Sequence, residues 1–161
     1  MRRKIRIYSL GMVVYLLFLA CSHSESPLPF DPNIKDLEMV QLVTGEEAKQ
    51  AIDQLHGMPI NVVRGFIVHY KGLYGRATVW VSEATTEDLA TEQIEVMIDK
   101  MKKSKRSPFS NYRQWNKEGW DIIAFDGMGQ VHYVFKDKIW VYWISADARC
   151  MDMILEHIQN G

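Results

Sequence analysis

The chain has 161 residues, of which 47% are hydrophobic and 24% are charged, and its 19 basic and 20 acidic side chains leave a formal charge of −1. These values are typical of a globular protein with one core and exclude wholesale disorder. The near-neutral balance argues against a nucleic-acid partner, and two cysteines are too few for a disulfide scaffold.

The first twenty residues predict export. Four basic residues within the first six positions precede an uncharged, apolar stretch at 7–20. This stretch is shorter than the roughly 20 residues that span a bilayer as a helix, and it has the length of the apolar region of a secretory signal peptide. Removing 1–20 removes four basic groups and no acidic group, which leaves a net charge of −5 on the remaining residues. The average charge of that part does not attract it to anionic headgroups.

The apolar stretch ends in Phe18-Leu19-Ala20-Cys21, and Ser22 follows. This ending resembles the lipobox of bacterial lipoproteins. The resemblance implies that the Cys21 thiol carries a diacylglycerol, that the chain is cut before Cys21, and that the protein is a membrane-anchored envelope lipoprotein facing away from the cytoplasm. Without Asp after the cysteine, the resemblance implies the outer membrane where the organism has one. The alternative is an ordinary signal peptide that is cleaved after Ser22, which would give a soluble secreted or periplasmic protein without Cys21.

A lipidated, proline-rich tether is predicted at 21–35, because three of the five prolines fall at positions 27, 29 and 32. Polar sequence rich in proline stays extended and builds no core. We therefore expect one folded domain over 36–161 and no contribution of the tether to its stability.

The first half of this domain alternates between strand and helix periods. In chain order we expect a short strand at 37–43, a helix capped by Thr44 and Glu47 that ends at Gly57, a hairpin of strands 62–70 and 76–82, and a long helix at 86–103.

The second half is predicted to be a polar loop at 104–119 followed by three strands and a helix. The strands are expected at 120–125, 130–135 and 139–144, with a tight turn at Asp126-Gly127, and Ser145 is expected to cap the last helix.

The resulting order, β-α-β-β-α-β-β-β-α, predicts an α+β fold. We expect a mainly antiparallel sheet of five to six strands with three helices packed on it. The first six elements match a ferredoxin-like, split β-α-β order, followed by a C-terminal hairpin and helix. Such an order carries no function by itself.

No motif predicts a catalytic, metal or cofactor site. The glycine clusters join strands and lack the context of a phosphate-binding loop, and the five histidines share no metal-ligand spacing. The basic stretch from Lys100 to Arg106 is interpreted as favourable charge at a helix C-terminus rather than a headgroup site. Cys150 is interpreted as a buried, inert thiol.

The strands are apolar on both faces. If the helices cover only one face, aromatic side chains remain on the surface of the other. We predict a binding surface of Trp80, His132, Trp140 and Tyr142 on the sheet face away from at least two helices. Their pairing across strands is expected to bring His132 beside Trp140 and Tyr142. The alternative is that the last helix or a second sheet layer covers this face, which would make these side chains part of the core.

Two functions of different classes follow. The first is a non-catalytic binding or assembly module that uses the aromatic face for an envelope protein or an apolar ligand. The second is a small envelope enzyme whose site assembles from distant residues such as His69, Asp121, His132 and Cys150. A deep pocket that holds at least two of these residues would favour the enzyme.

Overall fold

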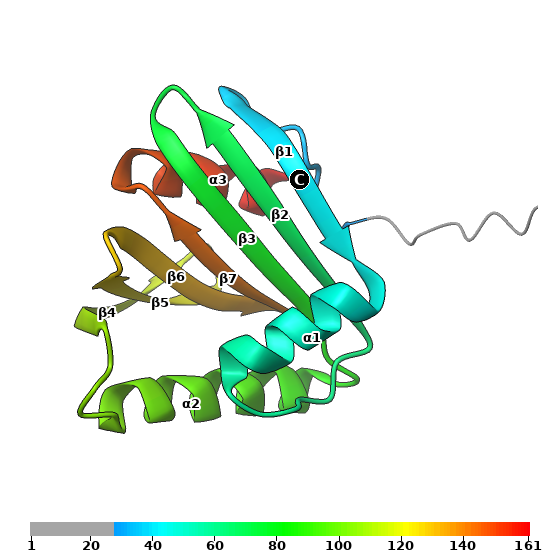
Figure 1. The fold of residues 1–161 in the computed structure, drawn as a ribbon, viewed down its shortest axis with the longest axis vertical. Helices are drawn as coiled ribbons and strands as arrows, with labels where there is room; N and C mark the ends of the chain where they lie inside the picture. The colour runs from blue at the N-terminus through cyan, green and yellow to red at the C-terminus, as the bar shows by residue number, and fades with distance from the viewer. Residues whose placement is uncertain (1–27) are drawn as a thin grey trace, which may run out of the picture.

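The computed structural model describes residues 28–161 and shows an α+β fold built on one antiparallel sheet (Figure 1). The elements in chain order are β1 (Leu37–Thr44), α1 (Gly45–His56), β2 (Arg64–Gly72), β3 (Gly75–Glu83), α2 (Glu87–Lys103), β4 (Phe109–Lys117), β5 (Trp120–Gly127), β6 (Gln130–Asp137), β7 (Trp140–Ala146) and α3 (Ala148–Asn160). The predicted signal peptide, lipobox and lipidated Cys21 lie outside the described residues. Within the described residues, no helix combines the length and the apolar character needed to cross a membrane.

The sheet has seven strands in the order β1-β2-β3-β7-β6-β5-β4, and every neighbouring pair is antiparallel. The predicted ferredoxin-like start is not confirmed, because β1 pairs directly with β2 instead of lying parallel to it across a crossover. Thr44 at the end of β1 is the partner of Phe66 near the start of β2. The chain therefore leaves the sheet at the end of β1, forms α1 and the connection after it, and returns to the same end of the sheet to begin β2.

The prediction of five to six strands was too low by β4, which lies within the predicted loop 104–119. This strand is at the edge of the sheet, and most of its side chains are exposed. It pairs with β5 through residues such as Trp115, whose partner is Ile122, and its register is interrupted between Ser110 and Arg113. An exposed, polar edge strand lacks the apolar alternation by which strands are recognised in a sequence.

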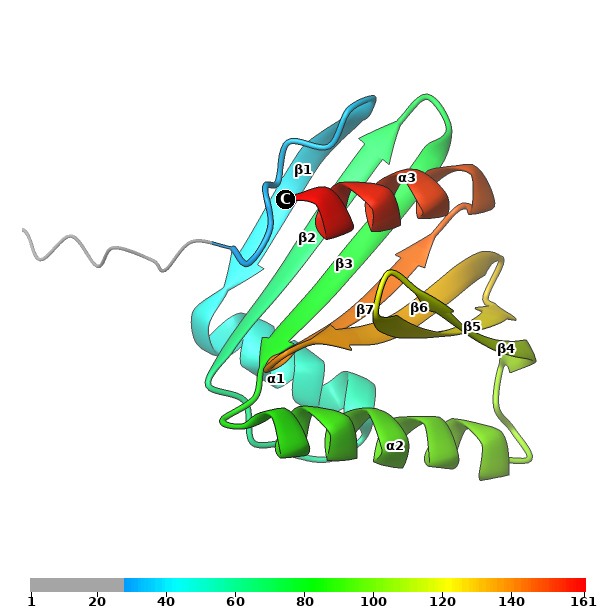
Figure 2. The same ribbon diagram turned by 180° about the vertical axis from the view of Figure 1, so that it is seen from behind.

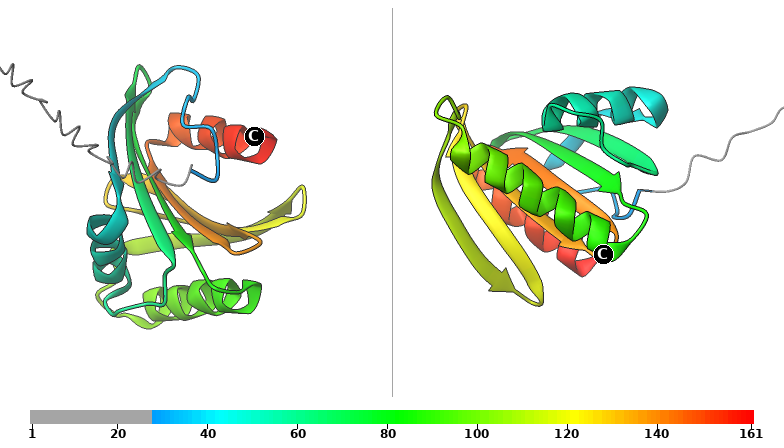
Figure 3. Two further views of the ribbon diagram at one scale, coloured as in Figure 1. Left: turned by 90° about the vertical axis from the view of Figure 1, so that its right-hand side faces the viewer. Right: turned by 90° about the horizontal axis from the view of Figure 1, so that it is seen from below.

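Helices cover both faces of the sheet, which explains why its strands are apolar on both sides (Figures 1 and 2). In β7, Tyr142 and Ile144 belong to the core beneath α3, whereas Val141 and Trp143 belong to the core beneath α2. Helix α1 packs on the same face as α2, over the β1–β3 end of the sheet. Figure 3 shows α2 and α3 on opposite sides of β7.

Residues 28–35, predicted to be part of an extended tether, instead pack against the domain. Phe30 and Ile34 are 5% and 3% exposed and belong to the core beneath α3. The Tyr70 hydroxyl donates a hydrogen bond to the carbonyl oxygen of Pro32 (3.1 Å), and Nε2 of His157 donates to that of Asp31 (2.8 Å). Desolvation raises the pKa of Tyr70, so its hydroxyl stays protonated as a donor. The prediction failed because two apolar side chains outweigh the extended preference of the prolines around them.

The docked segment gives a first test. Phe30→Ala should lower the free energy of unfolding by about 3–5 kcal/mol, because it leaves a cavity in the core beneath α3. Leu73→Ala is the control, since Leu73 is 86% exposed at the β2–β3 turn and should change stability little. Chemical denaturation measures both. A Phe30→Ala value no larger than that of the control would show that this segment does not stabilise the domain.

Candidate functional site

The four predicted binding residues do not form one surface. Trp80 pairs with Trp143 and His132 pairs with Ser145, which places Trp80 and His132 on the α2 side of the sheet. Trp140 and Tyr142 lie on the α3 side. The expectation that His132 lies beside Trp140 and Tyr142 was wrong. The register of β6 against β7 pairs His132 with Ser145, whose side chain points to the other face of the sheet.

Tyr142 and Trp140 are held within the fold on the α3 side. Tyr142 is 2% exposed and stacks on Phe135 with ring centroids 4.9 Å apart. Trp140 is half-buried, and its ring lies against Phe66 and beneath the guanidinium group of Arg64, 5.1 Å from the ring centroid. Tyr142 is therefore a core residue, and Trp140 is mostly covered by neighbours from β2.

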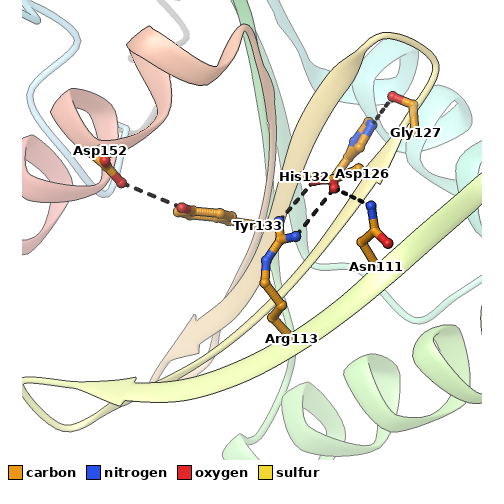
Figure 4. Close-up of polar contacts among 7 residues, drawn as sticks. All are labelled: Asn111, Arg113, Asp126, Gly127, His132, Tyr133 and Asp152. Atoms are coloured by element: carbon orange, nitrogen blue, oxygen red, sulfur yellow. Dashed lines mark hydrogen bonds and ion pairs between the residues drawn. The ribbon is translucent and has the colours of Figure 1, made fainter.

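His132 is a buried structural residue whose two ring nitrogens are both occupied. Nε2 lies 3.0 Å from the carbonyl oxygen of Gly127, as Figure 4 shows, and Nδ1 receives the indole N–H of Trp143 at 3.1 Å. An indole N–H can only donate, so Nδ1 is the acceptor and Nε2 carries the hydrogen. Ser145 Oγ, 2.9 Å from Nδ1, contacts this histidine and does not cap α3, which begins after Asp147. Burial lowers the pKa of His132 and keeps the ring neutral.

The acidic group nearest to this region is also committed to the fold. Arg113 donates to both carboxylate oxygens of Asp126 (2.8 and 3.2 Å), and Asn111 donates to one of them (2.9 Å; Figure 4). These bonds, the Arg113 bond foremost, lower the pKa of Asp126 to about 2. Asp126 thus holds the edge strand β4 against β5 at the point where the register shifts. On the neighbouring strand β6, the Tyr133 hydroxyl donates a hydrogen bond to the Asp152 carboxylate of α3 at 3.4 Å.

The residues of the alternative enzyme site are not brought together. His69 contacts Thr78 on the α1 side, whereas Cys150 is a fully buried residue of α3 on the opposite face. Asp121 accepts a hydrogen bond from Asn116 across the β4–β5 hairpin. Burial raises the pKa of the Cys150 thiol. In residues 28–161, no group of three or more His, Cys, Asp or Glu side chains could hold a metal ion.

A cleft of about 210 Å³ lies between the C-terminal end of α1 and the outer side of α2. Its apolar walls come from the connection after α1 and from α2: Met58, Pro59, Ile60, Leu89, Val96 and Met97. Its inner boundary reaches the sheet, because His56 and Met97 also border a small cavity lined by Trp80 and Trp143. Of the four predicted binding residues, Trp80 is the one that lies near this cleft.

Local hydrogen bonds fix the shape of the cleft. Gly57 adopts a left-handed conformation (φ 66°) that ends α1, as its position in the sequence predicts. The Asp53 carboxylate then accepts the backbone N–H of Ile60 at 2.8 Å, and the Gln93 amide donates to the carbonyl oxygen of Asn61 at 3.2 Å. The connection after α1 is thereby attached to both helices.

Two side chains that line the cleft each carry a buried acceptor atom without a hydrogen bond. His56 donates from Nδ1 to the carbonyl oxygen of Ile52 (2.8 Å), which leaves Nε2 as a buried atom with no hydrogen bond. Burial lowers the pKa of His56, so this nitrogen keeps its lone pair. Gln93 Oε1 is likewise buried and unpaired. An unpaired buried polar group costs about 1–3 kcal/mol, so each of these atoms lowers the stability of this part of the fold.

The basic residues at the end of α2 have other partners near the cleft. Lys100 lies at its rim, with Nζ 2.8 Å from the Met58 sulfur. Lys102 lies over the ring of Tyr112, and Lys103 pairs with Asp99 in the preceding turn. These contacts agree with the interpretation of the basic stretch as charge at a helix terminus.

Sequence reasoning missed His56 and Gln93. They are 37 positions apart, and neither belongs to a motif. Gly57 and Pro59 indicated the end of a helix, but nothing in the sequence indicated that α2 would lie across that end. Only the packing of α1 and α2 on one face brings the two side chains to one cleft.

No family model and no curated protein matches this chain. Among solved structures, it is similar to the crystal structure of a GTP-binding regulator from Thermotoga maritima, with a TM-score of 0.51 and 12% sequence identity. The match covers 78% of this chain and 77% of that chain. At this identity the similarity concerns the fold alone.

The two buried histidines predict a pH-dependent stability. Because the pKa values of His132 and His56 are lowered in the folded state, the unfolded chain binds more protons below the ordinary value of 6.5. The free energy of unfolding should be highest above pH 7 and should fall as the pH drops through 6.5. His132→Gln should remove part of that dependence and cost about 1–3 kcal/mol at pH 7.

The control is His56→Gln, which should retain the part of the pH dependence that His132 contributes. The free energy of unfolding of the double variant should be nearly independent of pH in this range. Denaturant unfolding at pH 5, 6 and 7 measures these slopes. An unchanged slope in His132→Gln would contradict the assignment of a neutral, buried ring at this position.

Proposed function

We propose that this protein is a bacterial envelope lipoprotein, anchored through a lipid on Cys21, whose domain is a non-catalytic binding module. The observation that carries the binding role is the cleft between α1 and α2, which combines apolar walls with the polar side chains of His56, Gln93 and Lys100. Ligand sites in proteins are commonly concave, mostly apolar and supplied with a few polar groups that fix orientation. The small volume of the cleft favours a small ligand over a large one.

The state of the titratable groups supports binding over catalysis. A general acid or base needs a group that is free to exchange a proton with a substrate. His132 uses both nitrogens within the fold, and Asp126 is held as a carboxylate by Arg113.

The docked N-terminal segment bears on how such an anchor would hold the domain. Leu28 packs against the core and lies only seven positions after Cys21. A chain of that length spans at most about 25 Å. A lipid on Cys21 would thus hold the domain close to the membrane. The docked segment lies on the α3 face, and the helices α1 and α2 lie on the other face of the sheet (Figures 2 and 3). The cleft between those two helices is therefore on the face away from the docked segment.

The anchor is tested by labelling. Full-length protein in bacterial cells should incorporate labelled palmitate and fractionate with membranes, and Cys21→Ser should lose both properties because serine cannot form the thioether. Cys150→Ser is the matched control and should keep the label, since that thiol is buried between α3 and the sheet. Unlabelled, soluble wild-type protein would instead support cleavage after Ser22.

The cleft is tested by filling it. Phenol should shift the backbone amide NMR signals of residues 56–61 and of the cleft side of α2, and Val96→Trp should abolish these shifts. Val96 is 42% exposed, so its replacement should fill the cleft with little loss of stability. Leu73→Trp, at the far turn of β2–β3, should leave the shifts unchanged. Shifts that persist in Val96→Trp would place phenol elsewhere and contradict the proposed site.

A further inference from the structure

We propose that one end of the domain, formed by the β2–β3 and β5–β6 turns, rests on the surface of a phospholipid bilayer. The apolar residues of the two turns enter the headgroup region, and Lys71 and Arg76 contact lipid phosphates. This inference rests on the proposed lipid anchor and adds the surface by which the anchored domain meets the membrane.

The two turns expose apolar side chains at the same end of the sheet. The β2–β3 turn consists of Leu73 and Tyr74, and the β5–β6 turn contains Met128. Leu73 and Met128 are 86% and 71% exposed, and Tyr74 is exposed as well. The turns at the opposite end, β4–β5 and β6–β7, instead carry Glu118 and Lys138. Turns are usually built from polar residues and glycine, so this end of the sheet is distinguished by its apolar tips.

A polar groove of about 560 Å³ lies between the two turns. It is on the sheet face that carries α1 and α2, at the end that these helices leave uncovered (Figure 1). Its ionisable side chains include His69, Lys71, Arg76 and Asp147, and Met128 forms part of its wall. The groove therefore places basic side chains beside one of the apolar tips.

The two strongest bases of the groove repel each other and have no partner in the fold. Lys71 and Arg76 are directly opposite each other across β2 and β3, a position in which like charges destabilise a hairpin. Within residues 28–161, neither side chain forms an ion pair or a hydrogen bond. Asp147 directs Oδ2 to the backbone N–H of Arg76 (2.7 Å), and Glu38 is the partner of Lys71 on β1 without pairing with its charge. A phosphate between the two bases would relieve their repulsion.

A bilayer surface combines what the turns and the groove require. Aromatic and apolar side chains are favoured in the headgroup region, and basic side chains beside them reach the phosphates of anionic lipids. The net charge of −5 after residue 20 does not attract the domain as a whole. The contact is therefore confined to this end, where the apolar tips and the unpaired basic side chains coincide.

The proposed anchor has the reach that this contact needs. The docked segment runs alongside β1 (Figure 2), and Leu37 at the start of β1 is the partner of Gly72, next to the β2–β3 turn. The chain from Cys21 to Leu28 spans at most about 25 Å, which is close to the length of the 8-residue strand β1. A lipid on Cys21 can therefore lie level with the two turns.

The basic stretch after α2 offers a matched control. Lys105 and Arg106 are exposed, as Lys71 and Arg76 are, but they follow the C-terminal end of α2, far from the β2–β3 turn (Figure 1). Replacing either pair by glutamine changes the net charge of the protein by the same amount. A difference between the two double variants therefore reports the position of the charges and not their number.

The test uses the lipidated full-length protein in nanodiscs of equal parts phosphatidylcholine and phosphatidylglycerol, with a nitroxide on some of the headgroups. The amide NMR signals of residues 71–76 and 127–130 should lose several-fold more intensity than those of residues 56–61 at the cleft. Lys71→Gln with Arg76→Gln should reduce this difference several-fold, and Lys105→Gln with Arg106→Gln should leave it unchanged. Inorganic phosphate, added without nanodiscs, is the second probe.

Each outcome has a distinct meaning. Equal losses in the two groups of signals of the wild-type protein would overturn the contact and leave the anchor in place, and this comparison needs no variant. A protein that takes up no palmitate and does not enter nanodiscs would overturn the anchor together with this inference. Saturable shifts of residues 71 and 76 with inorganic phosphate, without losses in nanodiscs, would assign the groove to free phosphate instead. Equal effects of the two double variants would also contradict the assignment to Lys71 and Arg76.

Discussion

The requirement that β7 be covered on both faces organises the whole domain. This strand lies at the centre of the sheet, between β3 and β6, and carries Tyr142 and Ile144 on one side and Val141 and Trp143 on the other. Apolar surface on both sides must be removed from water, so helices are needed above and below the sheet. Helix α3 follows β7 directly and covers one face, and α2 returns from β3 to cover the other.

The two faces are covered to different degrees. On the α3 side, a single helix and the docked segment around Phe30 close the core beneath α3. On the other side, α1 and α2 share the face, and the connection after Gly57 is pinned between them by Asp53 and Gln93. The cleft is the space that these two helices leave, and its position follows from where α1 ends.

The buried polar groups differ between the sheet and the candidate site in how many hydrogen bonds they make. Asp126 and His132 carry ionisable side chains, yet each uses its hydrogen-bonding capacity on neighbouring strands and turns. His56 and Gln93 each make one internal bond and keep a second, buried atom unpaired. Buried polar groups are normally satisfied within the fold, as those of Asp126 and His132 are.

The sequence by itself determined the α+β class, all three helices and six of the seven strands, because the side-chain period reports helix or strand locally. The edge strand β4 escaped because its residues are mostly exposed, and the docking of Phe30 escaped because two apolar side chains in a proline-rich stretch have no period. Only the tertiary structure decided the strand order, the side of the sheet on which His132 lies, and the meeting of His56 with the cleft side of α2. Periodicity tells which residues of one element share a face, but the partner of that face depends on register and packing between elements far apart in the chain.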